Sequence, residues 1–92
     1  MDMQRHLLYV AQEELKDCHL PKLRAVTAIW KDPVVCLSFY FDGEITEEEI
    51  EAASDLCTYI IAQFSEGQLE ENYLRLDYPK PLPIEFLAYK RN

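Results

Sequence analysis

The spacing of hydrophobic residues divides the chain into six elements, and the first is an amphipathic helix. Between Asp2 and Asp17 the apolar residues recur at intervals that suit a helix: Met3, Leu7, Leu8, Ala11 and Leu15. This spacing predicts a helix that presents one apolar face to a core. The dipeptide Leu20-Pro21 ends it, because proline is not tolerated in a helix interior.

Two strands are predicted next, over Leu23–Trp30 and Val34–Phe41, because both runs are rich in β-branched and aromatic residues. Asp32 and Pro33 between them favour a bend, so the strands are expected to pair as a hairpin. Alternate residues of a strand share one face. The second strand is therefore expected to fill the centre of the core with Val35, Leu37, Phe39 and Phe41. The face away from the helices is expected to carry Tyr40, Trp30 or Arg24 and to stay partly open.

A second helix is predicted from Thr46 to about Phe64. The Thr46 hydroxyl can accept a hydrogen bond from the Glu49 amide while the Glu49 carboxylate returns to the Thr46 amide, which is a capping box. Acidic residues in the first turn also suit the positive end of the helix dipole. Apolar residues then repeat at helical spacing: Ile50, Ala53, Cys57, Ile60, Ile61 and Phe64. Ser65-Glu66-Gly67 ends the helix.

The remaining chain predicts two shorter strands. Tyr73–Tyr78 alternates polar and apolar residues, the proline-rich segment 79–83 is excluded from a central strand, and Ile84–Lys90 follows as an edge strand. The order α-β-β-α-β-β predicts an α+β fold in which an antiparallel sheet of three or four strands has both helices packed on one face. A chain of 92 residues is expected to form a single domain over residues 1–92.

Acidic residues are concentrated in the second half of the chain. Between Asp42 and Asp77 there are eleven, against Arg75 alone, so this segment carries −10 in a chain whose total charge is −8. Such a field repels nucleic acid and lipid head groups and attracts basic partners.

A hydrophobic content of 49% argues for a folded domain rather than a disordered acidic tail. No apolar run approaches the roughly 18 residues of a membrane span, and no export signal is evident.

Patterns for catalysis, cofactors or metals are weak. Cys18, Cys36 and Cys57 are odd in number and widely spaced, which predicts reduced thiols in a cytosolic protein. A catalytic thiol needs a base beside it, and the two histidines, His6 and His19, are distant in sequence from Cys36 and Cys57. The sequence also lacks a glycine-rich phosphate loop. We therefore expect that the protein is not an enzyme. The adjacent Cys18 and His19 lack the further ligand pair that a zinc site needs. No cofactor is expected.

One alternative is a calcium site in the segment from Asp42 to Glu49. This segment resembles the second half of an EF-hand loop, with its two end residues as ligands and Gly43 at the sharp turn. The first two ligands would then be Ser38 and Tyr40, and tyrosine does not serve as a calcium ligand there. A strand-to-helix turn followed by a capping box accounts for every residue of the segment.

Three stretches together resemble a known class of protein: Leu23-Arg24-Ala25-Val26-Thr27, Phe39-Tyr40-Phe41-Asp42-Gly43-Glu44-Ile45 and Leu74-Arg75-Leu76-Asp77-Tyr78-Pro79. They resemble small acidic immunity proteins of bacterial toxin systems, in particular those that accompany contact-dependent growth inhibition toxins. The resemblance covers about residues 20–90. It implies a cytosolic inhibitor that binds the C-terminal domain of its toxin, often a basic nuclease, and blocks the active site or substrate groove.

The expected binding residues are the acids of the second helix, the acids that follow it, and a cluster of tyrosine and arginine, which are common interface anchors. They are Glu47, Glu48, Glu51, Asp55, Glu66, Glu70, Glu71, Tyr73, Arg75, Asp77 and Tyr78. Alternatively, the tyrosines only cover the sheet edge.

The alternative function is an acidic nucleic-acid mimic or an adaptor that regulates a DNA-binding protein. Both functions predict a protein partner, no binding to nucleic acid or membrane, and a monomer or weak homodimer.

Overall fold

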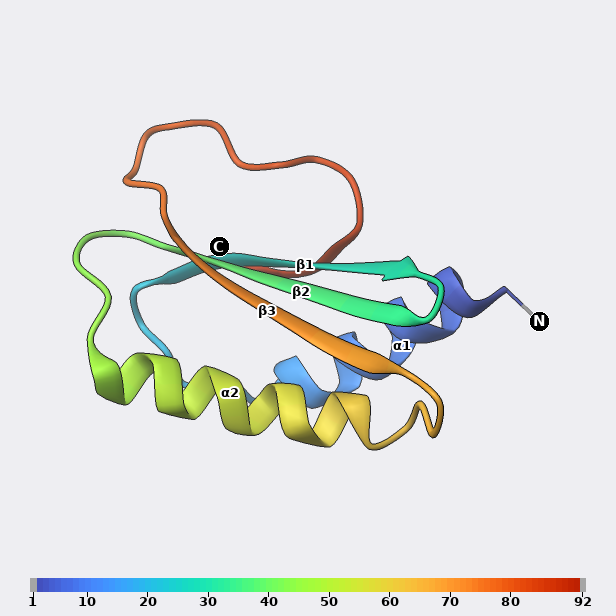
Figure 1. The fold of residues 1–92 in the computed structure, drawn as a ribbon. Helices are drawn as coiled ribbons and strands as arrows, with labels where there is room; N and C mark the ends of the chain where they lie inside the picture. Colours follow the sequence, from blue (N-terminus) through green and yellow to red (C-terminus); the bar gives the residue numbers. More distant parts are fainter. Residues whose placement is uncertain (1, 92) are drawn as a thin grey trace.

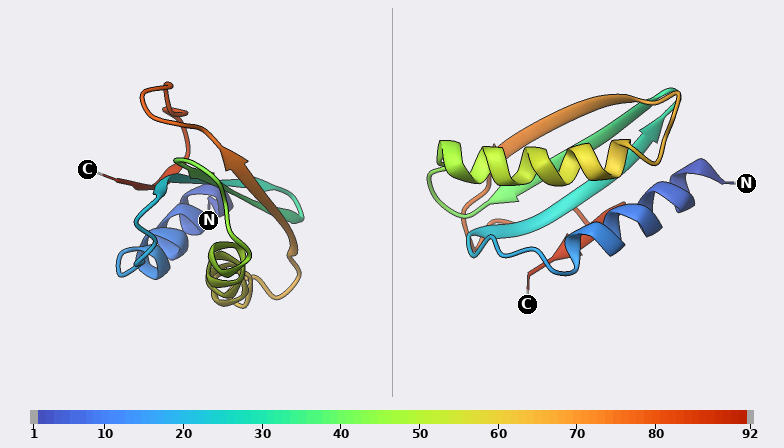
Figure 2. Two further views of the ribbon diagram at one scale, coloured as in Figure 1. Left: turned by 90° about the vertical axis from the view of Figure 1, so that its left-hand side faces the viewer. Right: turned by 90° about the horizontal axis from the view of Figure 1, so that it is seen from below.

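The computed structural model describes residues 2–91 and contains the six elements in the predicted order. They are α1 (Met3–Leu15), β1 (Leu23–Lys31), β2 (Val34–Phe41), α2 (Glu47–Ile61), β3 (Gln68–Arg75) and β4 (Leu87–Lys90). The strands form one sheet in the order β3-β2-β1-β4, and both helices cover the same face of it (Figures 1 and 2). The α+β class and the placement of the helices are thus confirmed. No helix within residues 2–91 has the length and apolar character to cross a membrane.

The sheet is mixed, which differs from the antiparallel sheet that was predicted. β1 pairs antiparallel with β2 and β4, but β3 runs parallel to β2, from Val34 opposite Gln68 to Phe41 opposite Arg75. The reason is the crossover formed by α2, which carries the chain back along the sheet so that β3 starts at the same end as β2. A pattern of alternating residues specifies which side chains share a face, but it does not specify strand direction.

β3 also begins five residues earlier than the predicted strand Tyr73–Tyr78. Gln68, Glu70 and Asn72 are polar and point away from the helices, so the first half of this edge strand has the composition of a loop. After β3 the chain must reach β4 at the opposite edge. Residues 76–86 make this connection across the sheet face that the helices leave open (Figure 1).

The core lies between the helices and the sheet. The four side chains predicted from β2 are buried there, together with three residues from each helix: Leu7, Ala11, Leu15, Ala53, Cys57 and Ile60. Burial of a valine, leucine, isoleucine or phenylalanine side chain is worth roughly 1.5–3 kcal/mol, so the larger of these residues contribute strongly to folding.

Trp30 lies on the helix side of the sheet, whereas the sequence placed it among candidates for the open face. It is in register with the buried Val35, and its ring lies 5.9 Å from that of Phe64, which follows α2. The side chain of Gln4 fixes α1 to the same strand, because it donates to the carbonyl of Ala28 at 2.8 Å and accepts from the amide of Trp30 at 2.7 Å.

Candidate partner-binding surface

The outer face of α2 carries exposed acidic residues. The capping box at Thr46 is formed as predicted, with Thr46 and Glu49 bonded in both directions, and it sets the rotation of the helix. Because Ala53, Cys57 and Ile60 face the core, the opposite side of the helix faces solvent. That side carries Glu47, Glu48, Glu51 and Asp55, all exposed. Among residues 2–91 none of these four carboxylates has a salt-bridge partner.

The three acids that follow α2, Glu66, Glu70 and Glu71, lie in three different places. Glu66 is exposed in the turn before β3. Glu70 lies on the open face, where its carboxylate accepts from the Cys36 thiol at 2.9 Å and from the Asn72 amide at 3.3 Å. The Cys36 bond, followed by the Asn72 bond, lowers the pKa of Glu70. Glu71 points to the helix side and accepts from the Ser54 hydroxyl at 3.3 Å. Adjacent residues of a strand point to opposite faces, so Glu70 and Glu71 cannot present one flat acidic patch.

Tyr73 packs inside the domain more than it projects from it. Its ring stacks on that of Phe39 with centroids 5.5 Å apart, and its hydroxyl donates to the Glu71 carboxylate. Partial burial and the Glu71 hydrogen bond raise the pKa of the Tyr73 hydroxyl. Tyr73 therefore packs β3 against the α2 side of the core. This packing suits the alternative in which the tyrosines cover the sheet edge, although the partly exposed part of the Tyr73 ring can still contact a partner.

Arg75, Asp77 and the turn after β2 form one hydrogen-bonded group at the end of the sheet where α2 begins. The Asp77 carboxylate accepts from Arg75 Nε at 3.1 Å and from the Gly43 amide at 2.7 Å. The Arg75 bond, followed by the Gly43 bond, lowers the pKa of Asp77. Gly43 has φ +87, a conformation that other L-residues rarely adopt. Asp77 therefore supports the turn that leads into α2.

The two end residues of the segment from Asp42 to Glu49 use their carboxylates for contacts with other protein groups. Asp42 accepts from the Tyr78 amide at 3.3 Å and lies 3.5 Å from Arg91, whereas Glu49 pairs with Lys22 at 3.1 Å. The described residues 2–91 contain no group of three or more His, Cys, Asp or Glu side chains placed to hold a metal ion. The geometry is that of the strand-to-helix turn with a capping box.

Arg24 is a structural residue of this surface whose role the sequence did not indicate. Only 7% of it is exposed, and its guanidinium donates to the carbonyls of Leu76 at 2.6 Å and Lys80 at 2.9 Å in the connection before β4. The exposed ring of Tyr78 lies over the guanidinium, with its centroid 5.8 Å from Cζ. The available signal was a charged residue between apolar neighbours, Leu23 and Ala25, in a predicted strand.

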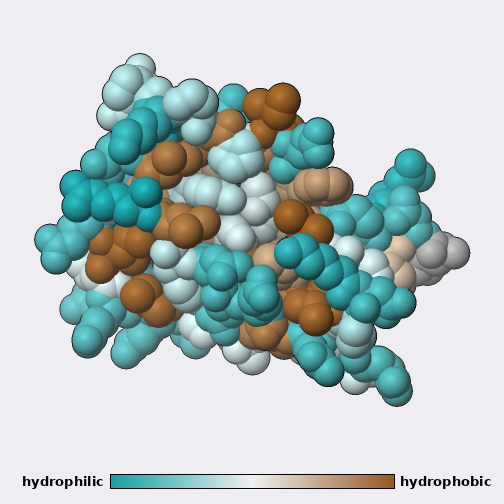
Figure 3. Space-filling view, turned by 45° about the horizontal axis from the view of Figure 1, so that its top comes forward, coloured by the Kyte–Doolittle hydropathy of each residue, from teal (hydrophilic) through white to brown (hydrophobic). Residues whose placement is uncertain are grey.

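The connection held by Arg24 presents apolar side chains to solvent. Tyr78 is 72% exposed and Ile84 89% exposed, and Leu74 and Phe86 are exposed nearby. Figure 3 shows that hydrophobic side chains on this side of the molecule are interspersed with hydrophilic ones rather than gathered in one patch.

The expected binding residues thus fall into two parts. The first is the acidic face on α2, with Arg75 and Asp77 beyond its N-terminal end, whereas Tyr78 lies over Arg24 on the sheet face that the helices leave open. The second consists of Glu66, Glu70, Glu71 and Tyr73, which lie along the β3 edge beside α2. Contacts between α2 and β3 make these parts neighbours.

Comparison with known proteins agrees with a partner-binding role. The family model described as MafI2 immunity protein matches residues 4–92, which is nearly the whole chain. No curated protein matches the sequence. The family match confirms the resemblance to immunity proteins of toxin systems, whereas the link to contact-dependent growth inhibition stays a prediction. The chain belongs to the MafI2 immunity protein family, and its partner is accordingly a cognate toxin protein.

Proposed function

We propose that the chain neutralises a nuclease toxin by covering its substrate groove with the acidic outer face of α2. The observation that carries this proposal is the outer face of α2, where Glu47, Glu48, Glu51 and Asp55 are exposed and form no salt bridge within residues 2–91. A nuclease must hold a phosphate backbone, so its working surface is basic and complementary to this face.

The spacing of the acids suits an extended contact. Glu47, Glu51 and Asp55 follow one another at intervals of four residues, which is about 6 Å along the helix axis. Carboxylates arranged in this way attract a row of lysine and arginine side chains. Such complementarity mainly raises the association rate and rejects partners of the wrong charge. Uncompensated acids on a rigid helix are therefore suited to rapid capture of a basic toxin.

Arg75 and Asp77 supply further contacts beyond the N-terminal end of α2, and Tyr78 is a separate anchor on the open face of the sheet. The hydrogen bonds that the segment accepts from the Gly43 amide and from Arg24 hold it in place, so little conformational entropy is lost when a partner docks on it. Inhibition is by occlusion, without catalysis by the immunity protein. On the resemblance to immunity proteins of contact-dependent systems, we place this activity in the cytoplasm of a bacterium exposed to such toxins.

A titration of nuclease activity tests the proposal. The cognate toxin domain, expressed from the neighbouring toxin gene, is incubated with labelled DNA or RNA and increasing amounts of this protein. Cleavage is expected to fall linearly and to stop at one inhibitor per toxin. A saturated complex that still cleaves nucleic acid would rule out groove blockage. Equal binding to several unrelated DNA-binding proteins would instead favour the acidic nucleic-acid mimic.

A further inference from the structure

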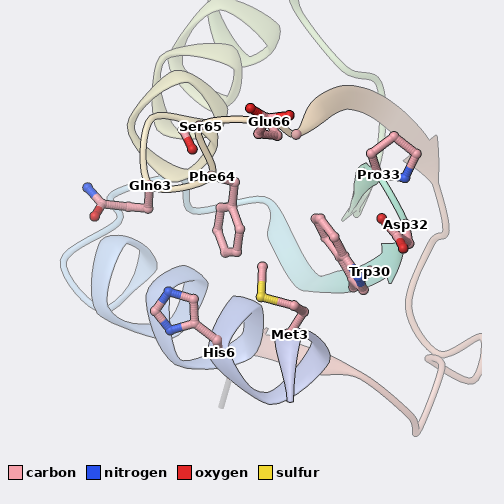
Figure 4. A pocket seen from close by; sticks show the side chains of 10 residues that line it. Met3, His6, Trp30, Asp32, Pro33, Gln63, Phe64, Ser65 and Glu66 are labelled. Carbon is pink, nitrogen blue, oxygen red and sulfur yellow. The ribbon is translucent and has the colours of Figure 1, made fainter. Parts of the chain in front are cut away.

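A hollow of about 360 Å³ lies between the first turn of α1, the β1–β2 hairpin and the segment after α2. Its wall contains Met3, His6, Trp30 and Phe64 (Figure 4). The Phe64 ring lies 5.3 Å from that of His6 and 5.9 Å from that of Trp30. Three elements thus bring aromatic rings and a thioether together at the end of the sheet opposite the Asp77 turn.

Among the described residues 2–91, the hollow is lined by two acids and by no lysine or arginine. Asp32 belongs to the hairpin turn and Glu66 to the turn after α2, and both are exposed. Figure 4 shows Asp32 at the hairpin and Glu66 at the turn after α2, with His6 on the other side of the hollow. Within residues 2–91 neither carboxylate has a salt-bridge partner. Aromatic rings and free carboxylates around one hollow are complementary to a cation with an apolar stem.

We infer that this hollow receives an arginine side chain of the cognate toxin. A guanidinium stacks on aromatic rings and can donate hydrogen bonds to two carboxylates through its planar set of N–H groups, whereas an ammonium group does so less well. The methylene stem of arginine would pack against Met3 and Phe64. The inference rests on the proposed function, because it takes the partner to be a toxin with a basic surface.

The hollow and the α2 face would contribute differently to the complex. Exposed charges mainly affect the association rate, whereas a side chain buried in a pocket mainly affects the dissociation rate. Trp30 would then be the central anchor, in agreement with the high frequency of tryptophan among energetically dominant interface residues.

A double neutralisation tests the inference without altering the core. In Asp32→Asn/Glu66→Gln the dissociation constant for the toxin domain is expected to rise roughly fivefold to tenfold, chiefly through faster dissociation. The control Asp17→Asn/Glu85→Gln removes the same charge at exposed positions that do not line the hollow, and it should change the constant less than twofold. If both double variants bind like the wild type, the hollow is not the arginine site, although the proposed function stands. If the wild type fails to bind the toxin, the proposed function itself is overturned.

A small probe tests the hollow independently of the toxin. Trp30 is the only tryptophan of the chain, so its fluorescence reports on this hollow. N-acetyl-arginine amide is expected to change the fluorescence saturably, and Asp32→Asn/Glu66→Gln should abolish the change. N-acetyl-citrulline amide, which has the same shape without the charge, should bind at least fivefold more weakly. Equal responses to the arginine, citrulline and N-acetyl-leucine amides would overturn the inference.

Discussion

Arg24 donates a hydrogen bond from Nη1 to the carbonyl oxygen of Leu76 at 2.6 Å, and so joins residues that lie 52 positions apart in the sequence. A second bond from the same guanidinium to Lys80 fixes the start of the connection between β3 and β4. The buried cation is thus satisfied by backbone carbonyls and the Tyr78 ring.

Replacing Arg24 is therefore expected to destabilise the domain. In Arg24→Met both carbonyls lose their donor while most of the side-chain volume is kept, so the free energy of unfolding should fall by about 2 kcal/mol. Urea denaturation measures this change. The control Arg5→Met alters an exposed arginine on α1 and should have little effect. An Arg24→Met protein as stable as the wild type would show that these bonds contribute nothing net.

Removal of the Thr46 cap should weaken α2. Thr46→Ala deletes the acceptor for the Glu49 amide and should cost about 1 kcal/mol of stability. Thr58→Ala is a matched control in the same helix, because the Thr58 hydroxyl only donates to the carbonyl of Ser54 and is exposed. Thermal unfolding of both variants checks the difference, and equal losses of stability would contradict a specific role for the cap.

Much of this architecture follows from local sequence signals. The hairpin, the capping box and the helix-facing residues of β2 were all predictable, because each depends on residues close together in the chain. The direction of β3 was not predictable, since it depends on how α2 crosses the sheet. The position of Trp30 required the register of the β1–β2 pair, which places it beside Val35.

The candidate surface was predictable only in part. The α2 acids could be identified because helical spacing places them opposite an apolar face. Alternation within a strand would have separated Glu70 from Glu71, but this required the knowledge that the strand begins at Gln68. The hollow around Trp30 joins residues 3 to 67 from three elements, so no local pattern indicates it.

The stability contributed by Asp77 should depend on pH. Arg75 and then the Gly43 amide lower the pKa of Asp77 in the folded state. This contribution is present in full above the ordinary aspartate pKa of about 3.9 and is lost as the pH falls from there through the folded-state pKa. Asp77→Asn should thus be less stable than the wild type at pH 7, and the difference should shrink in urea titrations at pH 3 and pH 2. A difference independent of pH would exclude this ion pair as its cause.

The three free cysteines should react at different rates with a disulfide reagent such as DTNB. Burial, followed by the charge of Glu71, raises the pKa of Cys57 to about 12, and burial followed by the Glu70 hydrogen bond raises the pKa of Cys36. Cys18 is the most accessible of the three. At pH 8 we expect one thiol to react in the folded protein and two more only in urea. Cys18→Ser should remove the first phase, and rapid reaction of all three native thiols would contradict the burial of Cys36 and Cys57.

The association rate with the cognate toxin domain at low salt tests most directly whether the α2 face captures a basic partner. Glu48→Lys/Glu51→Lys/Asp55→Lys and the control Glu13→Lys/Asp17→Lys/Glu85→Lys each change the net charge by the same amount. The first variant is expected to associate at least about tenfold more slowly than the wild type, and the control is expected to slow by much less. Equal rates for the two variants would contradict a specific role for this face.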